Sequence, residues 1–235
     1  MKRNRLLFLT ILLLVILLLD NGHKDRYQIV ARVNGDPIVL EEFKQKLVDN
    51  SASVYQYFNE KYGAVDSENF WTTGYSGEFP IEIARKKTLK ELVEVKVQQQ
   101  MAKEYGLQVN INYRDFMKEL EEENKSRKQA TVKGNVLYGP QQYDYNDYFT
   151  YSFNILRMKL QEELIGKEIL VTDQDIKDFY GKNQNKYFEG ISFKDARSNI
   201  QTELINTKYK KIVQNACDEA KVKINKKVYK DIFIR

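Results

Sequence analysis

The sequence predicts a mainly α-helical protein, in which an N-terminal membrane helix precedes an open set of helices with a small sheet. Three observations predict this class. Apolar residues recur at intervals of three and four over long segments between residues 40 and 213, as amphipathic helices require. Short alternating segments near both ends of the chain indicate strands. With 235 residues, 42% of them hydrophobic and 30% charged, the chain can bury a substantial core.

An uninterrupted apolar segment, Leu6 to Leu19, follows a cationic start, MKRNR. A helix of roughly 14 residues spans about 20 Å, which is short for a membrane crossing and typical of a signal-peptide core. The residues that follow offer no small-x-small cleavage site. We therefore expect an uncleaved signal anchor over residues 1–24, with cleavage as the alternative. Either way, the positive-inside rule places residues 25–235 on the extracytoplasmic side of the cell membrane.

The first expected elements after the anchor are a strand, a turn and a helix. Residues 28–34 alternate apolar and polar side chains, and NGDP, residues 34–37, is typical turn sequence. The helix covers residues 40–63, with the poor capping residue Val39 at its N-cap and a glycine at its end. Its apolar face contains Phe43, Leu47, Val54 and Phe58.

An aromatic loop over residues 64–80 ends in Pro80, which suits the first turn of a helix. The long helix that follows, residues 81–106, ends in a glycine stop at Gly106. We interpret Gln98 to Gln100 as exposed surface of this helix. Its apolar stripe contains Leu89, Leu92, Val93, Val97 and Met101.

The next expected element is a charged helix over residues 112–130, capped by Asn112. Residues 135–145 are rich in turn residues and form an irregular connection. An amphipathic helix then covers residues 147–164. Its apolar positions are Phe149, Phe153, Leu156, Leu160 and Leu164.

Two helices that each begin at a capping pair are joined by a brief connection. Thr172 with Asp175 opens the first helix, and Ser192 with Asp195 opens the second. The stretch Asn185 to Asp195 should form a tight surface connection, with the second helix packing back against the N-terminal half. Near the C-terminus, the alternation of Val222, Ile224 and Val228 predicts a strand that pairs with residues 28–34.

Composition limits the chemistry. The single cysteine, Cys217, excludes an intramolecular disulfide and a cysteine-rich zinc site. The single histidine, His23, lies at the membrane edge, without a cluster of metal ligands or catalytic partners. Without the three cations of the first five residues, 35 basic residues face 33 acidic ones, so the body has no electrostatic signature of nucleic-acid binding. We expect no cofactor and no metal.

Four segments together resemble the SurA-type chaperone domain, which the SurA, PrsA and PpiD foldases share. VARVNGDPIVLEEFKQKL is similar to its first strand, turn and helix, and KTLKELVEVKVQQQMAKEYGLQV to its long helix. VTDQDIKDFYGKNQNKYF and ISFKDARSNIQTELINTKYKKIV are similar to its later helices. The resemblance implies one helical chaperone domain over residues 25–235, with an N-terminal part at 25–187 and a closing helix and strand at 191–235. Val39 departs from the Ser or Thr that the family usually has.

A larger departure lies between the last two segments. In PrsA-like and PpiD-like foldases, a parvulin peptidyl-prolyl isomerase domain stands at this point, whereas this chain has about five residues. The parvulin pocket also resembles a histidine cluster with a GGxLG loop, and this chain has one histidine and no GG pair. The resemblance therefore implies a chaperone without isomerase activity, not an enzyme.

The leading hypothesis is a membrane-tethered protein that binds unfolded or partly folded exported polypeptides through aromatic side chains. The other interpretation of these aromatics is that they fix loops onto helices. A dedicated adaptor of an envelope or secretion complex is the second hypothesis, and a prolyl isomerase is the third. The candidate client-binding residues are Phe70, Trp71, Tyr75 and Phe79 in the first loop, and Tyr143, Tyr145 and Tyr148 around the second.

Overall fold

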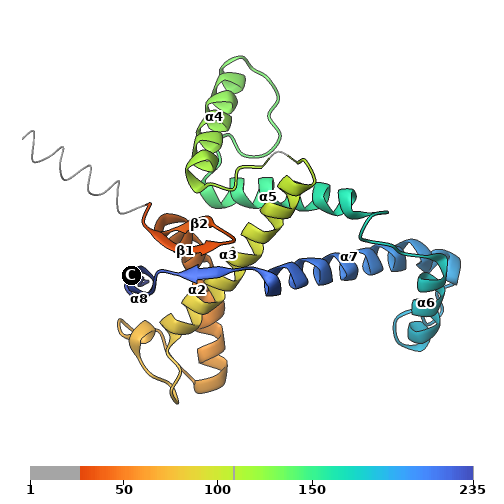
Figure 1. Ribbon diagram of the computed structural model, residues 1–235, viewed down its shortest axis with the longest axis horizontal. Coiled ribbons are helices and arrows are strands. Elements are labelled where there is room, and N and C mark those ends of the chain that lie inside the picture. The colour runs from red at the N-terminus through yellow and green to blue at the C-terminus, as the bar shows by residue number, and fades with distance from the viewer. Residues whose placement is uncertain (1–26, 108, 235) are drawn as a thin grey trace, which may run out of the picture. The chain divides into compact units, whose positions relative to one another are not determined.

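The computed structural model of the protein describes residues 27–107 and 109–234. The expected anchor, Leu6 to Leu19, and His23 lie outside the described residues. Within the described ranges, no helix combines the length and the apolar character needed to span a bilayer. The described fold is mainly α-helical with a small sheet, as the sequence predicts (Figure 1). The sheet is antiparallel and has three strands, one more than predicted.

The described residues form two compact units. Unit 1 contains residues 27–93, 112–114 and 221–234, and unit 2 contains the remaining described residues between 94 and 220. The division falls within one continuous helix, α3 (Pro80–Glu104). The domain boundaries that we expect from the sequence stay predictions.

The sheet of unit 1 joins segments from opposite ends of the chain. Strand β1 (Ile29–Val33) lies between β2 (Asp36–Val39) and β3 (Val222–Ile224) and is antiparallel to both. Figure 1 shows the blue strand β3 beside the red strand β1. The Asn34 amide donates to the Lys221 carbonyl at 3.0 Å and extends the pairing beyond the strands. The predicted pairing of the two terminal segments is confirmed.

Strand β2 was not predicted. Asn34 and Gly35 have positive φ angles, 51° and 102°, which suit a two-residue hairpin turn, so the chain reverses at once. Proline at position 37 argues against a strand because it lacks an N–H donor. The order β2-β1-β3 places β2 at an edge of the sheet, where a missing donor is tolerated.

The C-terminal strand is shorter than predicted. Asn225 follows β3 and caps a short helix, α8 (Lys226–Lys230), by accepting a hydrogen bond from the Val228 amide at 3.4 Å. The inclusion of Val228 in the strand pattern is therefore wrong. Asparagine favours such local caps over a strand ladder because its side chain satisfies a free backbone N–H.

Helix α2 (Leu40–Tyr62) packs against the sheet of unit 1. Val39 is its N-cap, as predicted, and the Glu42 carboxylate accepts a hydrogen bond from the Val39 amide at 3.4 Å. The helix ends at Gly63, whose φ of 63° is left-handed. The four predicted apolar positions of α2 are all buried.

Helix α3 has the ends that the sequence predicts. It begins at Pro80, and Gly106, with a φ of 78°, follows its last turn. The Leu107 amide donates to the Ala102 carbonyl at 2.9 Å, and the Gly106 amide donates to the Lys103 carbonyl at 3.0 Å. These two bonds form a Schellman motif, which satisfies the last carbonyls of the helix.

The interpretation of Gln98 to Gln100 as exposed surface is wrong for two of the three residues. Gln98 is 2% exposed and Gln99 is 6% exposed. The Gln98 side-chain carbonyl accepts a hydrogen bond from the Tyr209 hydroxyl at 2.7 Å, and burial raises the pKa of Tyr209. Amides can enter a helical core where such a partner is present.

Unit 2 contains α4 (Tyr113–Val132) from its third residue onward, α5 (Tyr145–Leu164), α6 (Asp173–Tyr187) and α7 (Phe193–Glu219), together with the second half of α3. Its main core joins α3, α5 and α7. The buried members of this main core are Ala102, Leu156, Leu160, Leu164, Ile169, Tyr209 and Val213.

The two predicted caps around the brief connection are confirmed. Thr172 and Asp175 bond reciprocally, at 2.9 and 3.1 Å, and the Ser192 hydroxyl accepts a hydrogen bond from the Asp195 amide at 3.3 Å. The connection itself covers residues 188–192 because α6 continues to Tyr187. The first part of α7 packs on α6 through a small apolar cluster, and its later part joins the main core of unit 2.

Arg85 on α3 holds the C-terminal segment of unit 1. Its guanidinium donates two hydrogen bonds to the Ile232 carbonyl, at 2.7 and 2.5 Å, in a buried setting. We predict that Arg85→Met lowers the free energy of unfolding by about 1–3 kcal/mol, because the buried carbonyl loses both donors. Urea unfolding followed by circular dichroism measures this loss. Lys86→Met, at an exposed neighbouring position, is the control, and equal stability of the two variants would contradict the assignment.

Candidate functional site

A groove in unit 2 has the features of a ligand site. It encloses about 280 Å³ and runs along α5, and we call it the α5 groove. The N-terminal half of α4, one residue of α3 and the segment after α3 complete its walls. Its apolar lining residues are Leu107, Val109, Phe116, Tyr148, Phe149, Tyr151, Phe153, Ile155 and Leu156, and its polar ones are Gln99, Asn110, Glu119, Ser152 and Lys159.

A row of stacked aromatic rings follows α5. Residues four apart lie on the same face of a helix, so the rings of Tyr145, Phe149 and Phe153 meet in sequence. The first pair stacks at 5.9 Å and the second at 5.4 Å between ring centroids. Phe116 of α4 packs edge-on against Phe149 at 5.9 Å. Phe149 and Phe153 are only half-buried, so their rings offer apolar surface to a ligand.

Polar groups on α4 and α5 fix one wall of the groove. Glu119 accepts hydrogen bonds from the Asn110 side-chain amide at 2.6 Å and from the Tyr148 hydroxyl at 2.9 Å. Burial, followed by the hydrogen bond to Glu119, raises the pKa of Tyr148. The phenol therefore stays neutral and remains a donor at physiological pH.

One polar atom of a residue that lines the groove has no hydrogen-bond partner among the described residues. The side-chain oxygen of Gln99 is buried and accepts no hydrogen bond within the described part of the chain. Sequence reasoning missed this residue as a site residue. The available signal was helical periodicity, because Gln99 lies four residues after Val95 and three before Ala102, both of which are buried.

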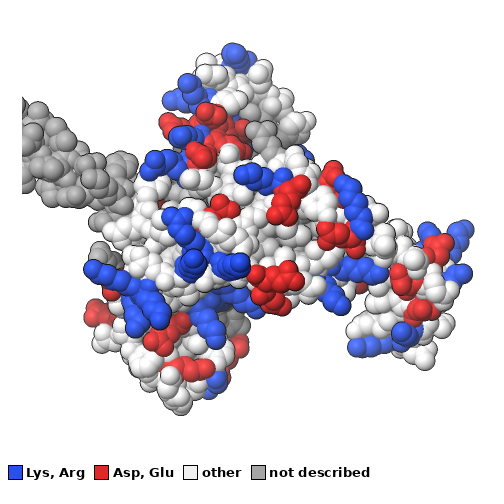
Figure 2. All heavy atoms as spheres, in the orientation of Figure 1, with Lys and Arg blue, Asp and Glu red and all other residues white. Residues whose placement is uncertain are grey.

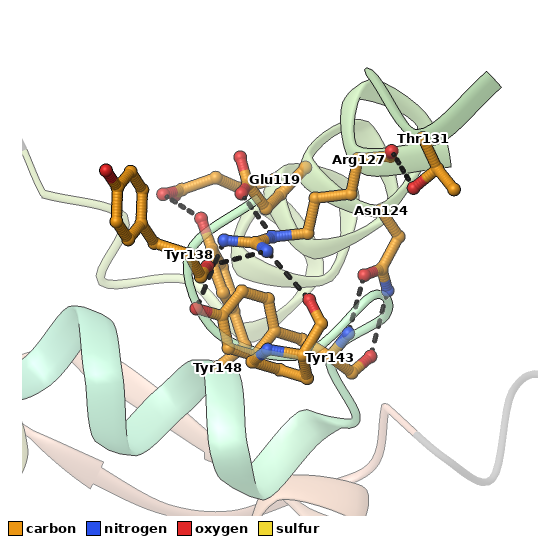
Figure 3. A network of polar contacts seen from close by, with 9 residues as sticks. Glu119, Asn124, Arg127, Thr131, Tyr138, Tyr143 and Tyr148 are labelled. Carbon is orange, nitrogen blue, oxygen red and sulfur yellow. Dashed lines mark hydrogen bonds and ion pairs between the residues drawn. The ribbon is translucent and has the colours of Figure 1, made fainter. Parts of the chain in front are cut away.

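The loop between α4 and α5 is clamped onto α4, as Figure 3 shows. The Asn124 side chain forms two hydrogen bonds with the Tyr143 backbone, at 2.8 and 2.9 Å. Arg127 donates to the carbonyls of Tyr138 and Pro140, at 3.1 and 2.7 Å. Its guanidinium also lies 4.4 Å from the centre of the Tyr143 ring. The loop is therefore fixed by specific contacts with α4.

The three candidate residues around this second loop differ in their surroundings. Tyr143 is buried beneath Arg127, which fits the interpretation that loop aromatics fix loops onto helices. Tyr148 lines the α5 groove, and Tyr145 begins the row of stacked rings. Their role in client binding stays a prediction.

The four candidates of the first loop belong to unit 1, whereas the residues that line the α5 groove belong to unit 2. Phe70, in the short 3-10 helix η1 (Phe70–Thr72), is 1% exposed and packs against Tyr55 and Phe58 of α2. Trp71 and Tyr75 are half-buried. Phe79 is 38% exposed and lies over Gly74. Their role in client binding also stays a prediction.

Glu78 ties this first loop to α2. Its carboxylate accepts hydrogen bonds from the hydroxyls of Tyr62 and Tyr57, at 2.7 and 2.9 Å, and an ion pair with Lys61 measures 3.1 Å. These partners, Tyr62 first, hold the pKa of the Glu78 carboxyl below its ordinary value. A single carboxylate thus joins both ends of the loop.

Charge is dispersed over the face of the molecule that Figure 2 shows. Figure 2 shows basic and acidic side chains interspersed on one face of the molecule. This pattern agrees with the nearly balanced charge of the chain after its first five residues. The lining of the α5 groove is similarly balanced, with one acidic residue, Glu119, and one basic residue, Lys159, among aromatic side chains.

Comparison with known proteins gives one informative match. The chain is similar to a protein of Bifidobacterium longum subsp. longum that is named as a chaperone for lacto-N-biosidase. The two are 18% identical over 204 residues, which cover 85% of this chain and 72% of that protein. No protein-family model matches the chain, and no solved structure matches it significantly. A distant relative of this chain is thus named as a chaperone. The specific resemblance to SurA-type foldases stays a prediction.

Acid should release the first loop. A carboxyl whose pKa is lowered by folding stabilises the folded state above its ordinary pKa, and this contribution disappears as pH falls through the lowered value. The Trp71 ring lies 5.0 Å from the Phe70 ring, measured between ring centroids. We predict that the fluorescence emission of Trp71 shifts to longer wavelength below about pH 4, because release of the loop exposes the indole to water. In Glu78→Gln, this acid-dependent step should be absent. Glu68→Gln, at an exposed position of the same loop, should keep it, and an unchanged step in Glu78→Gln would contradict the assignment.

Proposed function

We propose that this protein is a membrane-tethered, extracytoplasmic chaperone that binds unfolded or partly folded polypeptides without isomerising them. The observation that carries the proposal is the α5 groove, with its half-buried stacked rings. The similarity to a protein named as a chaperone supports the same function. The described groove thus supplies a physical means for the activity that the relative's name suggests.

Binding would be non-covalent. A volume of about 280 Å³ lies just below the range of ligand pockets, which enclose about 300–1,000 Å³. Such a groove accommodates a few side chains of an extended segment and excludes a folded domain. Burying one large apolar side chain stabilises the complex by roughly 1.5–3 kcal/mol, so single contacts are weak and reversible. Weak contacts suit a chaperone that must release its client.

The proposed tether compensates for this weakness. An anchor at Leu6 to Leu19 would confine the groove to the membrane surface where exported chains emerge. Confinement raises the effective concentration of the groove relative to those chains without any additional contact.

A dedicated chaperone is the second candidate, and the name of the relative favours it. That protein is named for one enzyme, lacto-N-biosidase. By analogy, this chain would serve one partner or a small set of partners. The identity of such a partner is a separate question from the chemistry of the groove.

Isomerase activity is not part of the proposal. In the foldases that the sequence resembles, the isomerase domain lies between the segments that correspond to α6 and α7. Here the connection between these helices covers residues 188–192. Efficient turnover of a prolyl peptide by the purified protein would contradict this part of the proposal.

An aggregation assay tests the function. The full-length protein, in phospholipid nanodiscs, should slow the aggregation of chemically unfolded proteins at near-stoichiometric ratio. We predict that Phe153→Ala weakens this effect about tenfold, because the groove loses an apolar wall. Light scattering measures the aggregation rate.

Tyr187→Ala is the matched control, since Tyr187 is exposed and lies outside the groove. It should retain full activity. Protection of several unrelated proteins indicates a general chaperone. Protection of one co-purifying partner indicates a dedicated one. Absence of protection for every protein, including co-purifying ones, would refute the proposed function.

A further inference from the structure

Two neighbouring glutamines of α3 are buried in different ways. Gln98 is satisfied, because its side-chain oxygen accepts a hydrogen bond from Tyr209 at 2.7 Å. The corresponding oxygen of Gln99 is buried without a partner within the described residues. Buried polar atoms in folded proteins nearly always have partners, because an unsatisfied acceptor destabilises the folded state. Gln99 therefore needs an explanation that Gln98 does not.

The explanation lies in the groove that Gln99 lines. Three of the donors on the groove wall are engaged elsewhere. Asn110 and Tyr148 donate to Glu119, and the Ser152 hydroxyl donates to the Tyr148 carbonyl at 2.7 Å. The other two donors of the lining belong to Tyr151 and Lys159, which are exposed to solvent. The Gln99 oxygen is itself buried, so an occupant of the groove supplies its missing donor once the side chain turns toward the groove.

We propose that the α5 groove binds an extended client segment that places an apolar side chain against Phe149 and Phe153 and donates a backbone N–H to Gln99. This inference rests on the proposed function and names the client chemistry. A backbone N–H fits because every residue except proline carries one at a fixed distance from its side chain. A cationic donor fits poorly, because its charge would be desolvated beside the apolar walls and the one carboxylate of the groove, Glu119, already accepts two hydrogen bonds.

The proposal implies a specificity rule. Many apolar sequences can bind, since the hydrogen bond uses the backbone and the rings accept any large apolar side chain. Proline at the donating position cannot bind in this way, because it has no N–H. The groove should therefore discriminate against proline at one position of the bound segment.

The first test compares matched variants of the two glutamines. Gln99→Leu removes an unsatisfied oxygen, so it should raise the midpoint of thermal unfolding by about 2–4 °C while weakening peptide binding about fivefold to tenfold. Gln98→Leu leaves the Tyr209 hydroxyl without its partner, so it should lower the midpoint and leave peptide affinity unchanged. A purely structural role for Gln99 predicts that Gln99→Leu lowers the midpoint.

The second test pairs the protein variant with a modified peptide. The probe is a fluorescein-labelled peptide, Ser-Thr-Phe-Thr-Ser, and its copies that are N-methylated at one backbone nitrogen at a time. Fluorescence polarisation measures their affinity for the full-length protein in nanodiscs. Methylation of one particular nitrogen should weaken binding to the wild type about fivefold to tenfold and should have no effect on Gln99→Leu.

The outcomes separate this inference from the proposed function. A peptide that binds the wild type, with no sensitivity to any N-methyl group or to Gln99→Leu, overturns the inference and leaves the proposed function intact. Absence of binding by this peptide and by its leucine and tryptophan counterparts, together with absence of protection in the aggregation assay, overturns both. Loss of affinity at one nitrogen in the wild type alone confirms the bond to Gln99.

Discussion

The pairing of β1 with β3 is the constraint on which the chain's path depends. The chain leaves unit 1 within α3 and contributes residues 112–114 to it in passing. It then completes unit 2 and returns so that Lys221 meets Asn34, 187 residues apart. Closing a loop of this length costs about 4–5 kcal/mol of entropy. A three-residue strand offers few hydrogen bonds against that cost, each worth about 1 kcal/mol. The buried bonds from Arg85 to Ile232 and the packing of Tyr229 on Phe43 therefore complete the closure.

Features of the fold that depend on local chemistry could be predicted from the sequence. Caps at Thr172 and Ser192, the glycine stop at Gly106 and the helical stripes each follow from neighbouring residues. Strand β2 could not be predicted, since the tolerance of Pro37 depends on its edge position in the finished sheet. The burial of Gln98 could not be predicted for a similar reason, because its hydrogen-bond partner, Tyr209, lies 111 residues away in the sequence. Sequence patterns identify local structure more reliably than they identify distant partners.

The residues of the candidate site were also difficult to identify from sequence patterns. Aromatic residues in loops were the natural candidates, yet Phe70 and Tyr143 are buried in contacts that fix those loops. The central rings of the groove, Phe149 and Phe153, belong to the apolar stripe of α5. A fully buried apolar stripe and a half-buried one have the same sequence pattern. Periodicity identifies the apolar face of a helix but does not show which elements pack against that face. Only the packing of α4 and α7 along α5 distinguishes them.

That packing also explains why the α5 groove stays open. Apolar walls tend to close on each other, since interiors pack densely. At one end of α5, Phe116 and Tyr148 form a cluster that the Glu119 hydrogen bonds hold in place. At the other end, Leu156 and the residues beyond it join the main core of unit 2. Phe149 packs partly against the first cluster and Phe153 partly against the main core, so both rings are only half-buried. A groove held open in this way leaves a polar atom such as the Gln99 oxygen without a partner, and that cost in stability is recovered when a client supplies the donor.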